Sequence, residues 1–168
     1  MNHMRMQWLA TVLILGSKVA VAGTVVDALA VSATISPNCA VTTSPVNFGP
    51  YNPASRLMTP ATGLVVITCT EDTFYDIALD AGVHPLKPGD VTSRQMARTE
   101  HDHDLPYALF VDSARMTLWS SQSSHAYRAG THAGSGAAHH YPVYGRIGAA
   151  RHAAGPYADT VIATLTYH

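Results

Sequence analysis

The chain has 168 residues, of which 47% are hydrophobic and 12% are charged, and its formal net charge is −1. This length is typical of one domain, and the charged share is about half of the usual value. Near-neutral charge argues against a nucleic-acid-binding protein, because such proteins need clustered Lys and Arg to displace counterions. No uncharged apolar run reaches about 18 residues, which argues against a mature membrane span.

Residues 1–22 have the three regions of a secretory signal peptide. Arg5 makes the first region positive, residues 8–16 are a short apolar core, and Ala20-Val21-Ala22 is an A-x-A cleavage site. We therefore expect residues 1–22 to direct export to the periplasm and to be removed. The alternative is an amphipathic helix that stays in the protein.

Cys39 and Cys69 are the only cysteines of the chain. In an oxidising compartment such a pair is expected to form a disulfide, here closing a loop of about 30 residues. Two free thiols or two metal ligands are the alternatives. The metal alternative is the weaker one, because the chain has no Cys-x-x-Cys spacing.

Short apolar segments separated by turn residues follow along the chain. The first, Val25–Ile35, alternates and places Val25, Leu29 and Val31 on one face. Periodicity alone also allows this segment to be the ordinary first strand of a complete sandwich. The other expected strands are residues 46–49, 63–70, 74–79, 94–97, 107–111, 117–119, 141–147 and 160–167. Residues 120–136 are expected to form a loop. This pattern predicts an all-β antiparallel sandwich, with a barrel as the alternative.

Histidine is frequent, and the closest approach to a metal cluster is His101-Asp102-His103-Asp104, with His132 and His139-His140 elsewhere. Neighbouring loop residues without a supporting framework make weak metal sites, so we expect no metal and no cofactor. We expect instead that these residues form a solvated polar loop.

The sequence carries no motif of a common hydrolase. Neither G-x-S-x-G nor H-E-x-x-H occurs, and the paired carboxylates Glu71-Asp72 fall in an expected turn. Asp112, Asp159 and Arg146 are expected to shape turns or form an ion pair rather than to act in catalysis. We therefore expect that the protein is not an enzyme.

Several blocks of the chain, in order, resemble the spore coat protein U domain family, and the match covers nearly all of residues 28–167. The blocks are Leu29–Ile35 before Cys39, Phe48-Gly49 with Tyr51 and Pro53, Ile67–Thr70, Tyr75–Gly82, Arg94–Met96, Leu105–Trp119, Val143–Ile147 and Gly155–Val161. Asp27 departs from the pattern, because it occupies the face that carries Val25 and Leu29.

This resemblance implies a secreted subunit of an archaic, Csu-type chaperone–usher pilus. Its fold would be an incomplete immunoglobulin-like antiparallel β-sandwich that lacks its last strand. Residues 23–35 would be a donor strand that runs into the first strand, and residues 36–168 would be the pilin domain. Val25, Leu29 and Val31 would enter the groove of a neighbouring subunit. The edge strand beside the chain's own groove would carry the residues Val161, Ala163, Leu165 and Tyr167.

The implied partners are copies of this chain or sister pilins, a periplasmic chaperone and an outer-membrane usher. The implied role is surface adhesion and biofilm formation by a fibre on the cell surface. Two other functions stay open at this stage. One is a non-polymeric secreted coat or envelope protein, and the other is a periplasmic His-rich metal-binding module.

Overall fold

The computed structural model describes residues 22–54, 57–98, 101–120, 127–148 and 152–168, with only the backbone described for residues 101–104 and 127–132. The expected signal peptide therefore lies outside the described residues, except for Ala22. The chain divides into two units, residues 1–34 and 35–168. No helix of the described ranges is long and apolar enough to cross a membrane.

The segment Val25–Ile35 is not a strand in the structure. Residues 22–38 have no regular secondary structure, and the side chains of residues 22–34 are exposed. An extended segment becomes a strand only when a neighbour satisfies its backbone N–H and C=O groups. Within the described part of the chain no strand pairs with this segment.

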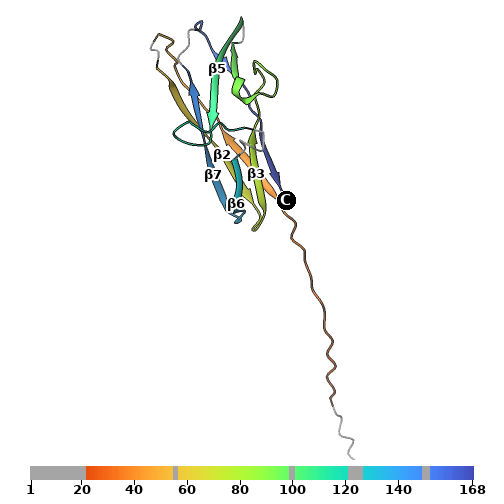
Figure 1. Cartoon of the computed structure of the whole chain (residues 1–168). Helices are drawn as coiled ribbons and strands as arrows, with labels where there is room; N and C mark the ends of the chain where they lie inside the picture. Colours follow the sequence, from red (N-terminus) through yellow and green to blue (C-terminus); the bar gives the residue numbers. More distant parts are fainter. Residues whose placement is uncertain (1–21, 55–56, 99–100, 121–126, 149–151) are drawn as a thin grey trace, which may run out of the picture. The chain divides into compact units, whose positions relative to one another are not determined.

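The larger sheet of residues 35–168 has six strands in the order β1-β2-β7-β5-β4-β8, and all neighbours are antiparallel. These strands are β1 (Cys39–Ser44), β2 (Thr59–Cys69), β4 (Gln95–Arg98), β5 (His101–Phe110), β7 (Ala138–Ile147) and β8 (Tyr157–Ala158). Figure 1 shows β2, β7 and β5 running side by side through the centre of this sheet.

The smaller sheet has three antiparallel strands in the order β6-β3-β9. These are β6 (Tyr127–Ala133), β3 (Phe74–Leu79) and β9 (Ala163–Tyr167). A short 3-10 turn, η1 (Val91–Ser93), precedes β4 and is capped by Asp90, whose carboxylate accepts a hydrogen bond from the Thr92 amide. The expected all-β antiparallel architecture is therefore confirmed.

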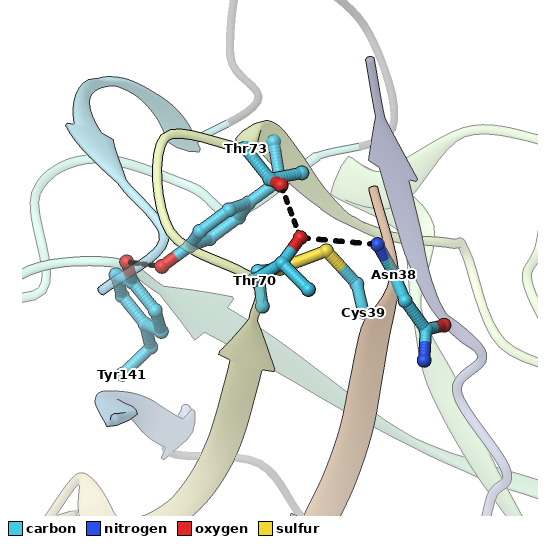
Figure 2. The surroundings of a disulfide bond; sticks show 7 residues. Asn38, Cys39, Thr70, Thr73 and Tyr141 are labelled. Atoms are coloured by element: carbon cyan, nitrogen blue, oxygen red, sulfur yellow. Dashed lines mark hydrogen bonds between the residues drawn. A yellow bond between two sulfur atoms is a disulfide. The ribbon is translucent and has the colours of Figure 1, made fainter. Parts of the chain in front are cut away.

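The core lies between the two sheets because alternate residues of the central strands point inward. The Tyr75 and Tyr141 hydroxyls join the sheets through a buried hydrogen bond of 2.6 Å, drawn in Figure 2. The alternating pattern is the one expected for a half-buried antiparallel sheet. The buried members of this core cluster are Val65, Ile67 and Cys69 of β2, Tyr75, Ile77 and Leu79 of β3, Leu105, Tyr107 and Leu109 of β5, and Tyr141, Val143 and Ile147 of β7.

Besides residues 25–35, four of the expected elements differ in the structure. Residues 101–104, expected in a polar loop, begin β5 and pair with β4. Residues 46–49 are not a strand, because the ladder of β1 ends at Ser44 and Pro45 follows with no N–H to donate. Residues 117–119 form only an isolated bridge, between Leu118 and Phe110. The expected loop 120–136 contains β6, which pairs with β3 although it has few large apolar residues. The segment before β6, residues 121–126, lies outside the described residues.

Candidate binding groove

A groove of about 930 Å³ opens onto the core of the sandwich. We use "the groove" for this cavity, which has a floor and two walls. One wall is residues 43–51 with Pro53, at the end of β1 and beyond it, and the other is residues 152–161 with Ala163, which lead into β9. The floor consists of apolar core side chains from five strands: Leu64, Val65, Leu79, Met96, Leu105, Leu109, Val143 and Ile147.

The first wall rests on two glycines of the larger sheet. A Cβ on Gly145 of β7 would come 2.6 Å from Val46 and 2.8 Å from the Phe48 ring, and one on Gly63 of β2 would come 2.7 Å from Val46. Only residues without a side chain allow this wall to lie so close to the sheet. The Phe48 ring also contacts Tyr107 edge to face, with centroids 6.4 Å apart. Residues 46–48 are therefore held by packing rather than by a β-ladder.

The second wall is held by the carboxylate of Asp159, whose side chain is only 2% exposed. It accepts hydrogen bonds from the Tyr107 hydroxyl at 2.6 Å and the Val83 amide at 3.0 Å, and His84 Nδ1 lies 3.2 Å away. Any Cβ on Gly82 would collide with this carboxylate. Burial raises the pKa of Tyr107, and its hydrogen bond to Asp159 raises it further, so the phenol keeps its proton.

Behind this wall lies Arg94, which is only 1% exposed. Its guanidinium donates to three backbone carbonyls: Asp80 at 2.5 and 2.8 Å, Trp119 at 2.9 Å and Leu79 at 3.0 Å. Burial lowers the pKa of Arg94, although arginine stays charged at any ordinary pH. The Asp80 carboxylate in turn accepts from the Ile162 amide at 2.9 Å. Arg94 thus links the core to the chain that enters β9.

The expected edge-strand residues lie at and beside the groove. β9 is an edge strand of the smaller sheet, paired with β3 on one side. Val161, just before β9, and Ala163 line the groove, and Leu165 packs against the core. Tyr167 lies at the end of β9 and is 43% exposed. Their role as the edge that accepts a donor strand stays a prediction.

The expected donor residues are far from buried in the chain by itself. Val25 is 96% exposed, and Leu29 and Val31 are each 88% exposed. Single exposed apolar side chains are common on proteins, whereas several gathered on one short segment mark a candidate interaction surface. Their insertion into a neighbour also stays a prediction.

The expected disulfide between Cys39 and Cys69 is present. It joins the first residue of β1 to the last residue of β2, as Figure 2 shows. The Asn38 amide donates to the Thr70 hydroxyl at 3.2 Å, and this hydroxyl is 2.6 Å from that of Thr73. The start of β1 is therefore tied to β2 at the point where the chain enters the sandwich.

The polar residues that the sequence singled out have structural roles. Asp112 accepts from the amides of Met116 and Thr117, as expected of a turn residue, and the Thr117 amide lowers its pKa. Arg146 lies over the Phe110 ring at 4.7 Å. Asp159 lies 3.2 Å from His84 Nδ1, a contact that is an ion pair only when His84 is protonated, and its closer partner is the Tyr107 hydroxyl at 2.6 Å. The importance of Arg94 was missed, because an arginine beside an expected strand carries no signal of burial.

The histidine-rich segments provide no visible metal centre. The side chains of His101, His103 and His132 lie outside the described residues. His139 lies 3.0 Å from the Ser135 hydroxyl. Among the side chains that the structure describes, no three His, Cys, Asp or Glu residues come close enough to hold a metal ion.

Comparisons with known proteins add a family and a fold. The model of the Spore Coat Protein U domain matches residues 25–164. No curated protein matches the chain significantly. The fold is similar to a chain in the crystal structure of the CsuC–CsuE chaperone–tip adhesion subunit pre-assembly complex from archaic chaperone-usher Csu pili of Acinetobacter baumannii.

That likeness has a TM-score of 0.59 and a sequence identity of 24%, and it covers 79% of this chain. It covers 40% of the other chain, so this chain spans less than half the length of that relative. At this identity the comparison shows the fold alone. It agrees with the expected immunoglobulin-like sandwich.

Proposed function

Because the chain belongs to the Spore Coat Protein U domain family, we propose that it is an exported structural subunit of a chaperone–usher pilus. In this proposal residues 1–22 direct export to the periplasm and are removed. Residues 23–35 are the donor strand, and residues 36–168 form the domain that accepts the donor strand of another subunit. The subunits polymerise by donor-strand exchange, and the fibre supports surface adhesion and biofilm formation. The family consists of structural proteins, so the chain is not an enzyme.

The observation that carries the proposal is an apolar groove that opens to the core beside an edge strand. Leu105, Val143 and other core side chains form its floor. β9 is an edge strand of the smaller sheet, and its residue Ala163 lines the groove. The outer edge of such a strand presents backbone N–H and C=O groups that can form hydrogen bonds with another strand. An added extended strand satisfies these groups and covers the apolar floor at once.

The N-terminal segment has the properties that this occupant needs. Residues 22–34 are exposed and form no helix or strand. Val25, Leu29 and Val31 are separated by odd numbers of residues, so an extended conformation turns all three to one side. A segment that already lacks secondary structure gives up no ladder of its own when it joins another subunit.

The proposed partners are copies of this chain or sister pilins, a periplasmic chaperone and an outer-membrane usher. The similar solved structure is itself a complex of a chaperone and a subunit, which supports the chaperone. A chaperone is also needed on physical grounds, because an open groove and a free strand edge favour aggregation before assembly.

The main alternative is a secreted coat or envelope protein that does not polymerise. It predicts a stable monomer whose residues 23–33 are dispensable. The metal-binding alternative has no support in the described side chains, which form no cluster of ligands.

The test is to produce the chain together with its chaperone and usher and to analyse the exported protein on an unboiled denaturing gel. The proposal predicts a ladder of oligomers that collapses to monomer on boiling. The triple variant Val25→Asn, Leu29→Asn, Val31→Asn removes the apolar donor face, and we expect it to abolish the ladder.

A matched control changes the opposite face of the same segment, with Val26→Asn, Ala28→Asn and Ala30→Asn. These positions point away from the donor face in an extended strand, so the ladder is expected to persist. A single monomer band from the folded, unmutated protein would overturn the proposal and favour the coat protein.

A further inference from the structure

One residue of the expected donor face is not apolar. Asp27 alternates with Val25 and Leu29, and it is the only charged residue between positions 23 and 35. It is exposed, and its carboxylate accepts a hydrogen bond from the neighbouring Ala28 amide at 2.9 Å. In an extended strand it points to the same side as Val25 and Leu29. A carboxylate that enters an apolar groove is costly unless a donor or a cation meets it.

The groove supplies one side chain that becomes such a cation when it takes up a proton. Among the described residues that line it, His152 is the only one whose side chain can carry a positive charge. It is half-buried on the second wall, where its ring contacts Tyr157 edge to face with centroids 6.4 Å apart. The Tyr157 hydroxyl is already bonded to the Ala153 carbonyl at 2.9 Å.

The acidic residue of the same wall is unsuited to receive Asp27. Asp159 is itself negative, and its oxygens are occupied by the Tyr107 hydroxyl and the Val83 amide. Like charges in a partly desolvated groove repel each other, whereas a carboxylate beside an imidazolium is attracted. Charge therefore favours a position of Asp27 beside His152 and disfavours one beside Asp159.

We propose that Asp27 of one subunit pairs with His152 of the next, and that this pair sets the register in which the donor strand occupies the groove. The inference rests on the proposed donor-strand assembly. A donor strand whose buried face is entirely apolar can shift by two residues along the groove with little loss of binding free energy, because a shift of two keeps the same face turned inward. A single charged pair removes this ambiguity and favours donors that carry an acid at this position.

The experiment is a charge exchange in full-length chains that are produced with chaperone and usher. Four chains are compared: the unmutated chain, Asp27→Lys, His152→Glu, and the double variant. The measured quantity is the half-life of the oligomer ladder in denaturing detergent at raised temperature. The assays are run at about pH 5.5, where an ordinary imidazole is mostly protonated. Each single change then places like charges together and is expected to shorten the half-life roughly tenfold. The double variant reverses the pair and is expected to recover most of the loss.

A milder pair guards against misfolding of the charge-reversed chains. Asp27→Asn and His152→Gln each remove one charge, and we expect the double neutral variant to be no weaker than either single one. The matched control combines Asp27→Lys with His139→Glu, a histidine of β7 that does not line the groove, and it is expected to give no recovery.

Losses that simply add in both double variants would overturn the pairing. An unmutated chain that forms no ladder would instead overturn the proposed assembly itself, so the two failures are distinguishable.

Discussion

Arg94 shows how one buried side chain organises the wall of the groove. Its charge is compensated by backbone carbonyls of Leu79, Asp80 and Trp119 rather than by a carboxylate in contact with it. A planar guanidinium can donate in several fixed directions at once, which an ammonium group cannot do. The Arg94 guanidinium therefore holds together the end of β3, the residue before β4 and the segment after β5.

The first prediction concerns Arg94→Lys. Lysine keeps the charge but cannot reach all three carbonyls, so the free energy of unfolding is expected to fall by about 2 kcal/mol or more. Urea unfolding of the chain without residues 1–22 measures this, with fluorescence of Trp119 as the signal, since the other tryptophan is Trp8.

Arg146→Lys is the matched control for that variant. Arg146 is only half-buried and lies over the Phe110 ring, so its replacement is expected to cost about 1 kcal/mol or less. Equal losses for Arg94→Lys and Arg146→Lys would show that the carbonyl contacts of Arg94 contribute little.

At the scale of elements, the first wall of the groove depends on the absence of side chains in two strands. Val46 and Phe48 lie directly over Gly63 and Gly145, and no ladder holds them. A substitution at Gly63 of β2 or Gly145 of β7 is therefore expected to displace the wall, although these glycines are distant from it in the sequence. This arrangement explains why Val46 and Phe48 pack against the core although residues 46–49 are not a strand.

The second prediction is that Gly145→Ala displaces Val46 and the Phe48 ring. The added methyl group would lie 2.6 and 2.8 Å from them, and such overpacking costs about 1–3 kcal/mol. We expect a lower urea midpoint and a weaker oligomer ladder. Gly148→Ala serves as the control, because a Cβ there meets nothing within 4 Å. A ladder of normal strength from a folded Gly145→Ala chain would contradict the role of this wall.

For the whole molecule, the disulfide and the groove define the two ends of the unit formed by residues 35–168. The disulfide ties β1 to β2 at the point where the chain enters the sandwich. The groove lies where the core meets β9 and the segment before it. The domain is thus closed covalently at its first strand and open beside its last one.

The third prediction is that moving residues 23–35 to the end of the chain closes this opening within one molecule. The segment is deleted from its own position and attached after His168 through a flexible linker. Covering the groove with three apolar side chains is expected to raise the melting temperature by about 10 °C or more. The chain is expected to stay monomeric with chaperone and usher, because its groove is already occupied.

The same fusion with Val25→Ser, Leu29→Ser and Val31→Ser keeps the added length but not the apolar face. It is expected to melt at the temperature of the chain that lacks residues 23–35 altogether. An equal rise for both fusions would show that the apolar donor residues do not enter the groove.

The sequence alone determined the sheet class and most of the central strands. β3 was predicted with its observed bounds, and the β-branched run of β2 and the alternation of β7 placed these strands to within a few residues. Alternation is a local property, since it follows from the pleat and from one buried face. The pairing of Cys39 with Cys69 followed from the compartment and from the presence of only two cysteines.

Tertiary structure alone decided which extended segments became strands and where the groove lies. Val25–Ile35 has a strand-like pattern and no partner in the described chain, whereas β6 has a weak pattern and is a strand because β3 pairs with it. A ladder needs two participants that can be far apart in sequence, and periodicity reports burial rather than the identity of the partner. The burial of Arg94 and the clamp around Asp159 likewise depend on contacts between residues tens of positions apart.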